Sequence, residues 1–254
     1  MTPEHPASGV ESPVRRSAAR DLTLAAVALA SGTVAIAASW AGAPGPSFGF
    51  WLAACFAGEL LWVRLPFGRA TLSMASTCNF AALILLPRAE AMLAAAGASL
   101  VAELLVMRKP PARLLFNAGQ TALAVGAAGL VYHTLAGATA SPAAVLLAKG
   151  LWPMLAAAAV YAAVNTGSVS LAIGVAERVA PWRAWWSNFG SLYELLSTSS
   201  LFSLGVLLAV LHALVGPAGT LLVCLPLLLS HESYRRYLKR VPEVEPAVRD
   251  RSAA

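Results

Sequence analysis

The sequence has too few charged residues for a water-soluble domain of its length. Only 12% of the 254 residues are charged, whereas 58% are hydrophobic; soluble domains usually have roughly 25% charged residues. Uncharged apolar runs, such as residues 22–40 and 114–131, have about the length that a helix needs to cross a bilayer. The shortage of charge therefore argues against an ordinary soluble fold and predicts an integral membrane protein.

Cysteine is also scarce, and the common catalytic motifs are absent. Cys55, Cys78 and Cys224 each lie within an apolar run, with no C-x-x-C pair and no Cys/His spacing suited to zinc. We interpret them as small buried side chains. The sequence contains no H-E-x-x-H, G-x-S-x-G or P-loop motif. We therefore expect no enzymatic activity, no metal and no other cofactor.

The charge that is present is mostly positive. Lys and Arg total 18 against 12 Asp and Glu, which gives a net charge of +6. The basic residues fall mainly in short segments between apolar runs, as the positive-inside rule describes for membrane proteins. We therefore expect the lipid bilayer, and not nucleic acid, to be the partner of this basic chain.

The apolar runs predict an all-α, polytopic transmembrane bundle. We expect eight spans, with seven as the alternative, because the second, third and eighth runs are shorter than the ~20 residues that a spanning helix needs. Breaks between the runs contain Gly and Pro, as at Pro66, Pro87 and Pro142. The eight predicted spans are residues 22–40, 48–63, 71–86, 89–107, 114–135, 151–175, 192–214 and 217–229.

The distribution of Lys and Arg predicts the orientation of these spans. With the N-terminus inside and eight crossings, 16 of the 18 basic residues lie on the cytoplasmic side, and only Arg88 and Lys149 lie outside. We expect a multi-pass protein of the bacterial cytoplasmic (inner) membrane with both termini inside. Its parts would be a polar N-terminal segment (1–20), the bundle (21–230) and a short basic tail (231–254).

Two kinds of segment have predicted structural roles in the bundle. Runs of small residues at 94–99, 126–129 and 156–159 favour close helix packing. Residues 181–189 contain three tryptophans and Arg183. That composition is typical of a segment at the lipid headgroups.

A few polar residues within the spans are the candidate site. Ionisable groups inside a membrane are costly, so each needs a partner or a function. Three carboxylates on separate spans, together with three amides, could converge on a cavity for a small or lipidic ligand. The alternative is structural: each carboxylate pairs with a nearby arginine, and the amides join neighbouring helices. The candidate ligand-binding residues are Glu59, Glu103, Asn117, Gln120, Asn165 and Glu194.

Four segments together resemble a known membrane module. They are residues 58–66 (GELLWVRLP), 115–133 (from LFNAGQTAL to VYH), 160–166 (VYAAVNT) and 226–238 (PLLLSHESYRRYL). In order and spacing they resemble the N-terminal multi-span sensor module of bacterial HD-GYP and GGDEF signalling proteins. The resemblance covers about 70% of the chain, from residue 58 to residue 238.

This resemblance implies sensing rather than catalysis. In that family the last membrane helix continues into a catalytic domain, whereas here Pro242 and Pro246 interrupt the corresponding stretch. We therefore expect a module without an output domain, which signals through a partner membrane or cytoplasmic protein or as a homo-oligomer. The alternatives are a small-solute transport subunit, similar to those of vitamin uptake systems, and a structural subunit of a larger membrane complex.

Overall fold

Helices make up nearly all the secondary structure in the computed structural model of the protein. The structure describes residues 13–64, 71–137 and 141–226, together with 228, 229, 232, 233 and 236. Most of the predicted N-terminal segment and basic tail lies outside these residues. The helices are α1 (Pro13–Ser39), α2 (Phe48–Leu60), α3 (Ala75–Leu85), α4 (Arg88–Leu105), α5 (Pro111–Ala136), α6 (Pro142–Lys149), α7 (Trp152–Glu177), α8 (Pro181–Phe189) and α9 (Leu192–Val215), followed by a short apolar helix at Pro217–Pro226.

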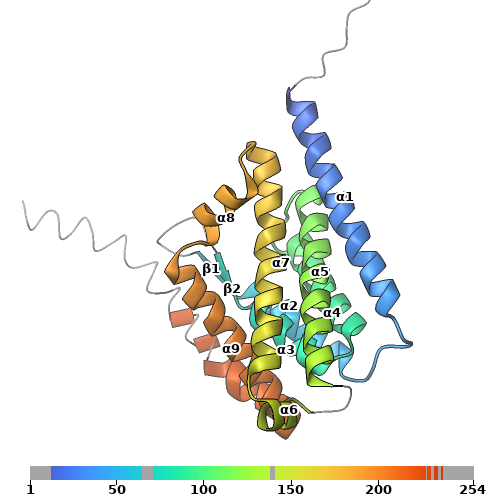
Figure 1. Ribbon diagram of the computed structural model, residues 1–254, viewed down its shortest axis with the longest axis vertical. Coiled ribbons are helices and arrows are strands. Elements are labelled where there is room, and N and C mark those ends of the chain that lie inside the picture. Colours follow the sequence, from blue (N-terminus) through green and yellow to red (C-terminus); the bar gives the residue numbers. More distant parts are fainter. Residues whose placement is uncertain are drawn as a thin grey trace, which may run out of the picture.

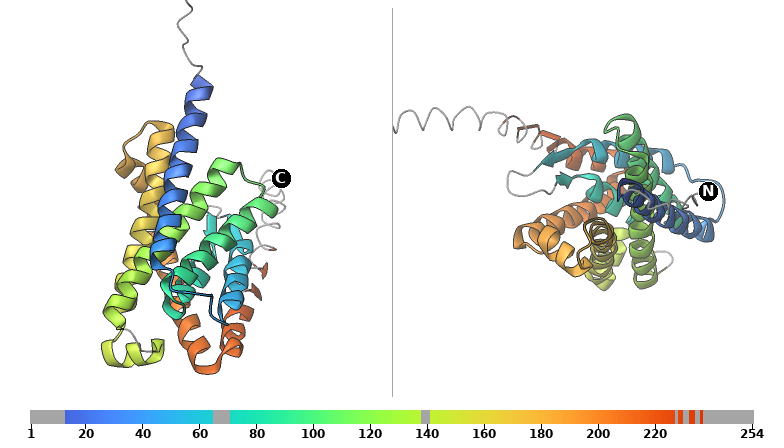
Figure 2. Two further views of the ribbon diagram at one scale, coloured as in Figure 1. Left: turned by 90° about the vertical axis from the view of Figure 1, so that its right-hand side faces the viewer. Right: turned by 90° about the horizontal axis from the view of Figure 1, so that it is seen from above.

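Helix α5 is the centre of the bundle. It packs against α1, α4 and α7, while α2 and α3 form a second group with α4 and α9 (Figure 1). Helix α1 runs along the outside of the bundle and extends past it (Figures 1 and 2). Helices α6 and α8 lie at opposite ends of α7 (Figure 1).

Small residues on α5 allow this close packing. A Cβ atom at Gly119 would lie 2.3 Å from the carbonyl carbon of Ala28 on α1, and one at Gly126 would lie 2.7 Å from the sulfur of Met92 on α4. Both glycines are buried. The predicted packing role of the run 126–129 is therefore confirmed at Gly126, as expected where helices associate through close van der Waals contact. In the run 94–99, Ala94, Ala95 and Ala98 are buried.

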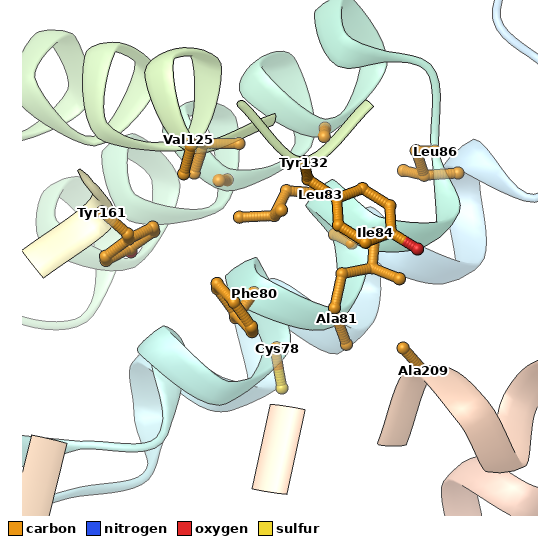
Figure 3. Packing of buried hydrophobic residues seen from close by; sticks show 14 of the residues in the cluster. Cys78, Phe80, Ala81, Leu83, Ile84, Leu86, Val125, Tyr132, Tyr161 and Ala209 are labelled. Carbon is orange, nitrogen blue, oxygen red and sulfur yellow. The ribbon is translucent and has the colours of Figure 1, made fainter. Parts of the chain in front are cut away.

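An aromatic cluster joins α3, α7 and α9. Phe80 of α3 is fully buried, and its ring centroid lies 4.9 Å from that of Phe202 and 6.4 Å from that of Tyr161. Figure 3 shows Phe80 and Tyr161 on neighbouring elements of the core. The Asn79 amide nitrogen donates to the Tyr161 hydroxyl at 3.4 Å. The Tyr161 and Phe202 rings also contact each other, with centroids 5.2 Å apart, so the three rings form one cluster.

The predicted helix boundaries around residues 62–73 are wrong. Residues Trp62–Arg64 (β1) and Thr71–Ser73 (β2) form a short antiparallel pair, with Trp62 opposite Ser73. Hydropathy alone cannot distinguish a helix from a strand in so short an apolar stretch. The β-branched residues Val63 and Thr71 favour a strand. Helices α2 and α3 are consequently only 13 and 11 residues long, or about 20 and 16 Å.

Two short helices lie between the longer ones. Helix α6 was not predicted, because its eight residues are too few for a span; Ser141 caps it by accepting a hydrogen bond from the Ala144 amide at 3.2 Å. Helix α8 corresponds to the predicted headgroup segment. Its Trp182 and Trp186 side chains are largely exposed, whereas Ala184 is buried. Its depth in a membrane remains a prediction.

The helical fold and the apolar spans support a membrane protein. In the part of the chain that the structure describes, four helices are long and apolar enough to cross a bilayer: residues Arg20–Ser39 of α1, and α5, α7 and α9. Helix α4 has 18 residues but contains three ionisable side chains, Arg88, Glu90 and Glu103. The count of eight spans and the cytoplasmic placement of both termini remain predictions.

The α1–α5 contact yields a test of the packing. Gly119→Ala should lower the free energy of unfolding by about 1–3 kcal/mol, because the added methyl group would overlap the Ala28 backbone. The control is Gly49→Ala in α2, where a Cβ would meet nothing within 4 Å. Thermal unfolding of both variants in detergent checks this expectation. Equal stability of the two would show that α1 can shift without cost.

Candidate functional site

Glu103 is the centre of a buried polar cluster at the α4–α5 connection. Its side chain is 4% exposed. Its Oε1 atom accepts hydrogen bonds from Lys109 Nζ at 2.5 Å and from Asn117 Nδ2 at 2.6 Å. The three residues come from the last turns of α4, the connecting loop and the second turn of α5. This carboxylate therefore ties the ends of two packed helices together.

A tight turn brings Lys109 back to Glu103. The Met107 amide donates to the Ala102 carbonyl at 3.0 Å, and the Lys109 amide donates to the Glu103 carbonyl at 3.1 Å. Arg108 between them has φ 52°, a left-handed conformation that is unfavourable for a residue other than glycine. The lysine consequently contacts Glu103 through both its backbone and its side chain. The predicted structural alternative named an arginine as the partner; the partner is Lys109.

Glu59 adds a second carboxylate near this cluster. It lies in the last turn of α2 and is half-buried. The charges of both Glu103 and Lys109 act on its carboxyl group. Two carboxylates are therefore close enough to one ammonium group for the three charges to interact, and a ligand with hydrogen-bond donors would be compatible with them.

Two acceptor atoms in this region are buried without a partner in the described part of the chain. They are Glu103 Oε2 and Gln120 Oε1. The Gln120 amide nitrogen donates to Thr121 Oγ1 at 3.2 Å, so only its oxygen is left. Buried acceptors are usually satisfied by protein or by ordered water. Chemically, these atoms can accept hydrogen bonds from water or from a ligand with donor groups.

The other two candidate residues lie elsewhere. Asn165 is half-buried on α7 and makes no hydrogen bond to another described residue. Glu194 is in the first turn of α9, where its backbone amide donates to Ser191 Oγ at 3.1 Å, and its carboxylate benefits from the helix N-terminus. The structure thus brings Glu103 and Asn117 into contact, with Glu59 close enough for an electrostatic interaction with Glu103. Glu194 lines a separate cavity.

That cavity lies between α7, α8 and α9 and has a volume of about 850 Å³. Its α7 wall is formed by small residues, including Ala158, Ala159, Ala162 and Gly167. The predicted close packing of the run 156–159 is confirmed at Ala157, which is fully buried, and at Ala158, which packs against the core, although Ala158 and Ala159 also line the cavity. A second cavity is formed by the α3–α4 connection, the last turns of α5 and the start of α6. The linings of these two cavities do not include Glu59, Glu103, Asn117, Gln120 or Asn165.

Trp185 and Thr166 close one end of this cavity. Trp185 Nε1 donates to Thr166 Oγ1 at 2.9 Å, and the Thr166 hydroxyl donates to the Ala162 carbonyl at 2.7 Å. Sequence reasoning missed both residues. Trp185 was interpreted as one of three headgroup tryptophans, and a lone threonine beside Asn165 carries no distinctive signal. Among the described residues no group of His, Cys, Asp and Glu side chains could hold a metal ion.

Comparison with known proteins identifies a related family. The model of the MASE9 family matches residues 47–232, from the residue before α2 to beyond the helix Pro217–Pro226. Helix α1 lies outside the matched region. No curated protein and no solved structure matches the chain.

Replacement of the Glu103 carboxylate tests its structural role. Glu103→Gln should lower the free energy of unfolding by about 1–3 kcal/mol, because Lys109 loses a short charged hydrogen bond, although its partly exposed ammonium group can reach the headgroups. The control is Glu232→Gln, which removes the carboxylate of an exposed pair with Arg236 and should cost less than about 1 kcal/mol. Thermal unfolding in detergent measures both.

A double variant tests whether Glu103 and Lys109 stabilise the protein as an ion pair. Lys109→Met should be more harmful than Glu103→Gln, since it leaves a buried carboxylate without its cation. Combining the two changes should restore part of that loss. If Glu103→Gln is as stable as the wild type, Glu103 is not a structural ion-pair partner, and its role as a ligand or proton site is favoured.

Proposed function

Because the chain belongs to the MASE9 family of membrane-associated sensor domains, we propose that it binds a small or lipidic ligand in the bacterial inner membrane and signals this to a partner protein. The family membership supports the sensor role. The cavity between α7, α8 and α9 is the observation that carries ligand binding, since its volume of about 850 Å³ is in the range of small-molecule sites.

The lining of this cavity favours a ligand with an apolar body and one polar end. Phe80, Met154, Phe202 and other apolar groups form most of the wall. The hydroxyl groups of Ser199 and Ser203 donate to carbonyls of their own helix, at 2.8 and 2.9 Å, so they offer little to a ligand.

The polar groups of the cavity are concentrated toward α8. Glu194 and Thr198 lie near the start of α9, and Trp185 with Thr166 marks the same end of α7. In the predicted topology this end faces the cytoplasm. A lipidic molecule with a hydrogen-bond donor in its head group fits this arrangement: its chain would contact the apolar wall, and its head would meet Glu194.

Helix α8 provides a route from the cavity to a partner. It connects α7 with α9 (Figure 1), and the Trp185–Thr166 hydrogen bond fixes it to α7. A ligand that separates or draws together α7 and α9 would shift α8, whose Trp182 and Trp186 side chains are exposed. The resemblance to modules of HD-GYP and GGDEF proteins supports an output protein on the cytoplasmic side. The chain itself would act by binding and not by catalysis.

Filling the cavity tests this proposal. Ala162→Phe should abolish retention of a cavity-bound compound while leaving the fold intact, because the added ring occupies space that the alanine leaves empty. Glu194→Gln should weaken retention of the same compound. Native mass spectrometry and lipid analysis of the full chain, purified in mild detergent, measure both effects.

A lipid-facing substitution is the matched control. Ala30→Phe adds the same ring at an exposed position of α1, away from the cavity, and should retain the compound at the wild-type level. Equal retention by Ala162→Phe and the wild type, or no retained compound in the wild type, would contradict ligand binding in this cavity.

A further inference from the structure

We propose that a second cavity binds an anion, through a phosphate or carboxylate group, at the opposite end of α7 from α8. The cavity has a volume of about 720 Å³. It is formed by the α3–α4 connection, the last turns of α5 and the start of α6. In the predicted topology it faces the outside of the cell. This site does not depend on ligand binding between α7, α8 and α9.

Two basic side chains line this cavity. Arg88 donates through Nε to Ser39 Oγ at 2.9 Å, and within the described part of the chain its two terminal nitrogens have no acceptor. The imidazole of His133 is near enough for the Arg88 charge to act on it. The guanidinium group of Arg88 is therefore the positive charge of this cavity, and an anion beside it would be attracted. A guanidinium group is well suited to paired hydrogen bonds with phosphate or carboxylate oxygens.

The described lining contains no carboxylate to compensate this charge. The nearest acidic residue along α4 is Glu90, whose Oε1 atom accepts a hydrogen bond from the Gly45 amide at 3.1 Å. Glu90 therefore faces the α1–α2 connection. Another cation, Lys149 of α6, donates to the Leu135 carbonyl at 2.6 Å. This lysine satisfies the end of α5 and adds to the positive charge near the cavity.

Two helix N-termini also border the cavity. Helix α4 begins at Arg88, directly after Pro87, and α6 begins at Pro142, after its capping residue Ser141. All four residues belong to the lining. Helix N-termini carry partial positive charge and favour bound anions. Both termini therefore reinforce the effect of Arg88.

Unpartnered polar atoms give independent support for a ligand. Tyr132 is only 2% exposed, yet its hydroxyl group has no hydrogen-bond partner among the described residues, and neither does Nε2 of His133. Both residues line the cavity. Figure 3 shows the Tyr132 hydroxyl next to Leu86, which belongs to the same lining. The Tyr132 hydroxyl group can donate to an oxygen of an anion.

The shape of the site leaves room for such a group. The stem of Arg88 lies against Gly129, where a Cβ atom would be 3.5 Å from Arg88 Cγ. The small residue at this position keeps the guanidinium group beside α5 and leaves the cavity open. The phosphate of a free solute and that of a lipid head group present the same chemistry to these residues, so the experiment must distinguish the two sources.

The test uses the full chain in nanodiscs and measures thermal unfolding. In neutral phosphatidylcholine discs, inorganic phosphate is added and compared with sodium chloride at equal ionic strength. In a second arm, phosphatidylglycerol replaces part of the neutral lipid and no phosphate is added. We expect stabilisation in at least one arm; the first identifies a free anion and the second a lipid head group. No stabilisation in either arm overturns the proposal.

Variants assign the effect to the cavity. Arg88→Gln should weaken the apparent affinity for the effective anion at least tenfold, and Tyr132→Phe several-fold. Since the Tyr132 hydroxyl has no partner, Tyr132→Phe should fold normally and keeps the proposal testable if Arg88→Gln does not fold. The control is Tyr193→Phe, at an exposed tyrosine of α9, with unchanged affinity expected. The same affinity in Tyr132→Phe as in Tyr193→Phe would overturn the assignment.

Discussion

Close contact between the backbone of α5 and its neighbours is the constraint on which the rest of the structure depends. In a bilayer, helices gain little from hydrophobic association with one another, so van der Waals contact and interhelical hydrogen bonds must hold them. Gly119 and Gly126 allow α1 and α4 to approach α5 closely. This fixes the position of polar groups at both ends of α5: Asn117 reaches Glu103 at one end, and Tyr132 with His133 reaches the second cavity, about 22 Å away along the helix.

The same small residues have the opposite effect on α7. There, Ala158, Ala159 and Ala162 face α9 across an open cavity. The contact between α7 and α9 is made by large side chains: the ring centroids of Tyr161 and Phe202 lie 5.2 Å apart, and Phe80 of α3 packs against both rings. Small side chains therefore give close packing only where no larger side chains meet between the helices.

This distinction also explains how much of the candidate site could be predicted. The position of a residue along its span follows from the sequence. It predicted similar depths for Glu103 and Asn117, which make a 2.6 Å hydrogen bond. The direction in which a side chain points around its helix does not follow from hydropathy. Glu194 starts a span at a similar predicted depth, yet it lines the α7–α9 cavity. The pairing of Glu103 with Lys109 depends on the left-handed turn at Arg108, which no local sequence motif predicts.

Hydropathy along the chain predicted the helices of the fold but not the contacts between them. Apolar length identified every long helix, while the short strands β1 and β2 contain apolar residues that resemble the ends of spans. Helix α6 was not predicted because it is only eight residues long. It nevertheless borders the cavity with Arg88 and His133. That cavity could not be predicted from a sequence interpretation in which these residues form a loop.

A sensor needs an element that ligands can shift between two arrangements. The α4–α5 hairpin is poorly suited to this role, because Glu103 ties one end of it and close packing against α1 restrains its length. The α7–α9 pair is better suited, since a cavity lies between the two helices and each packs mainly against a different neighbour, α7 against α5 and α9 against α3. Helix α8 joins α7 to α9 at one end; helix α6 leads toward α7 and packs against α9 at the other. The second cavity borders the start of α6, so an anion bound there would act on the short element that precedes α7.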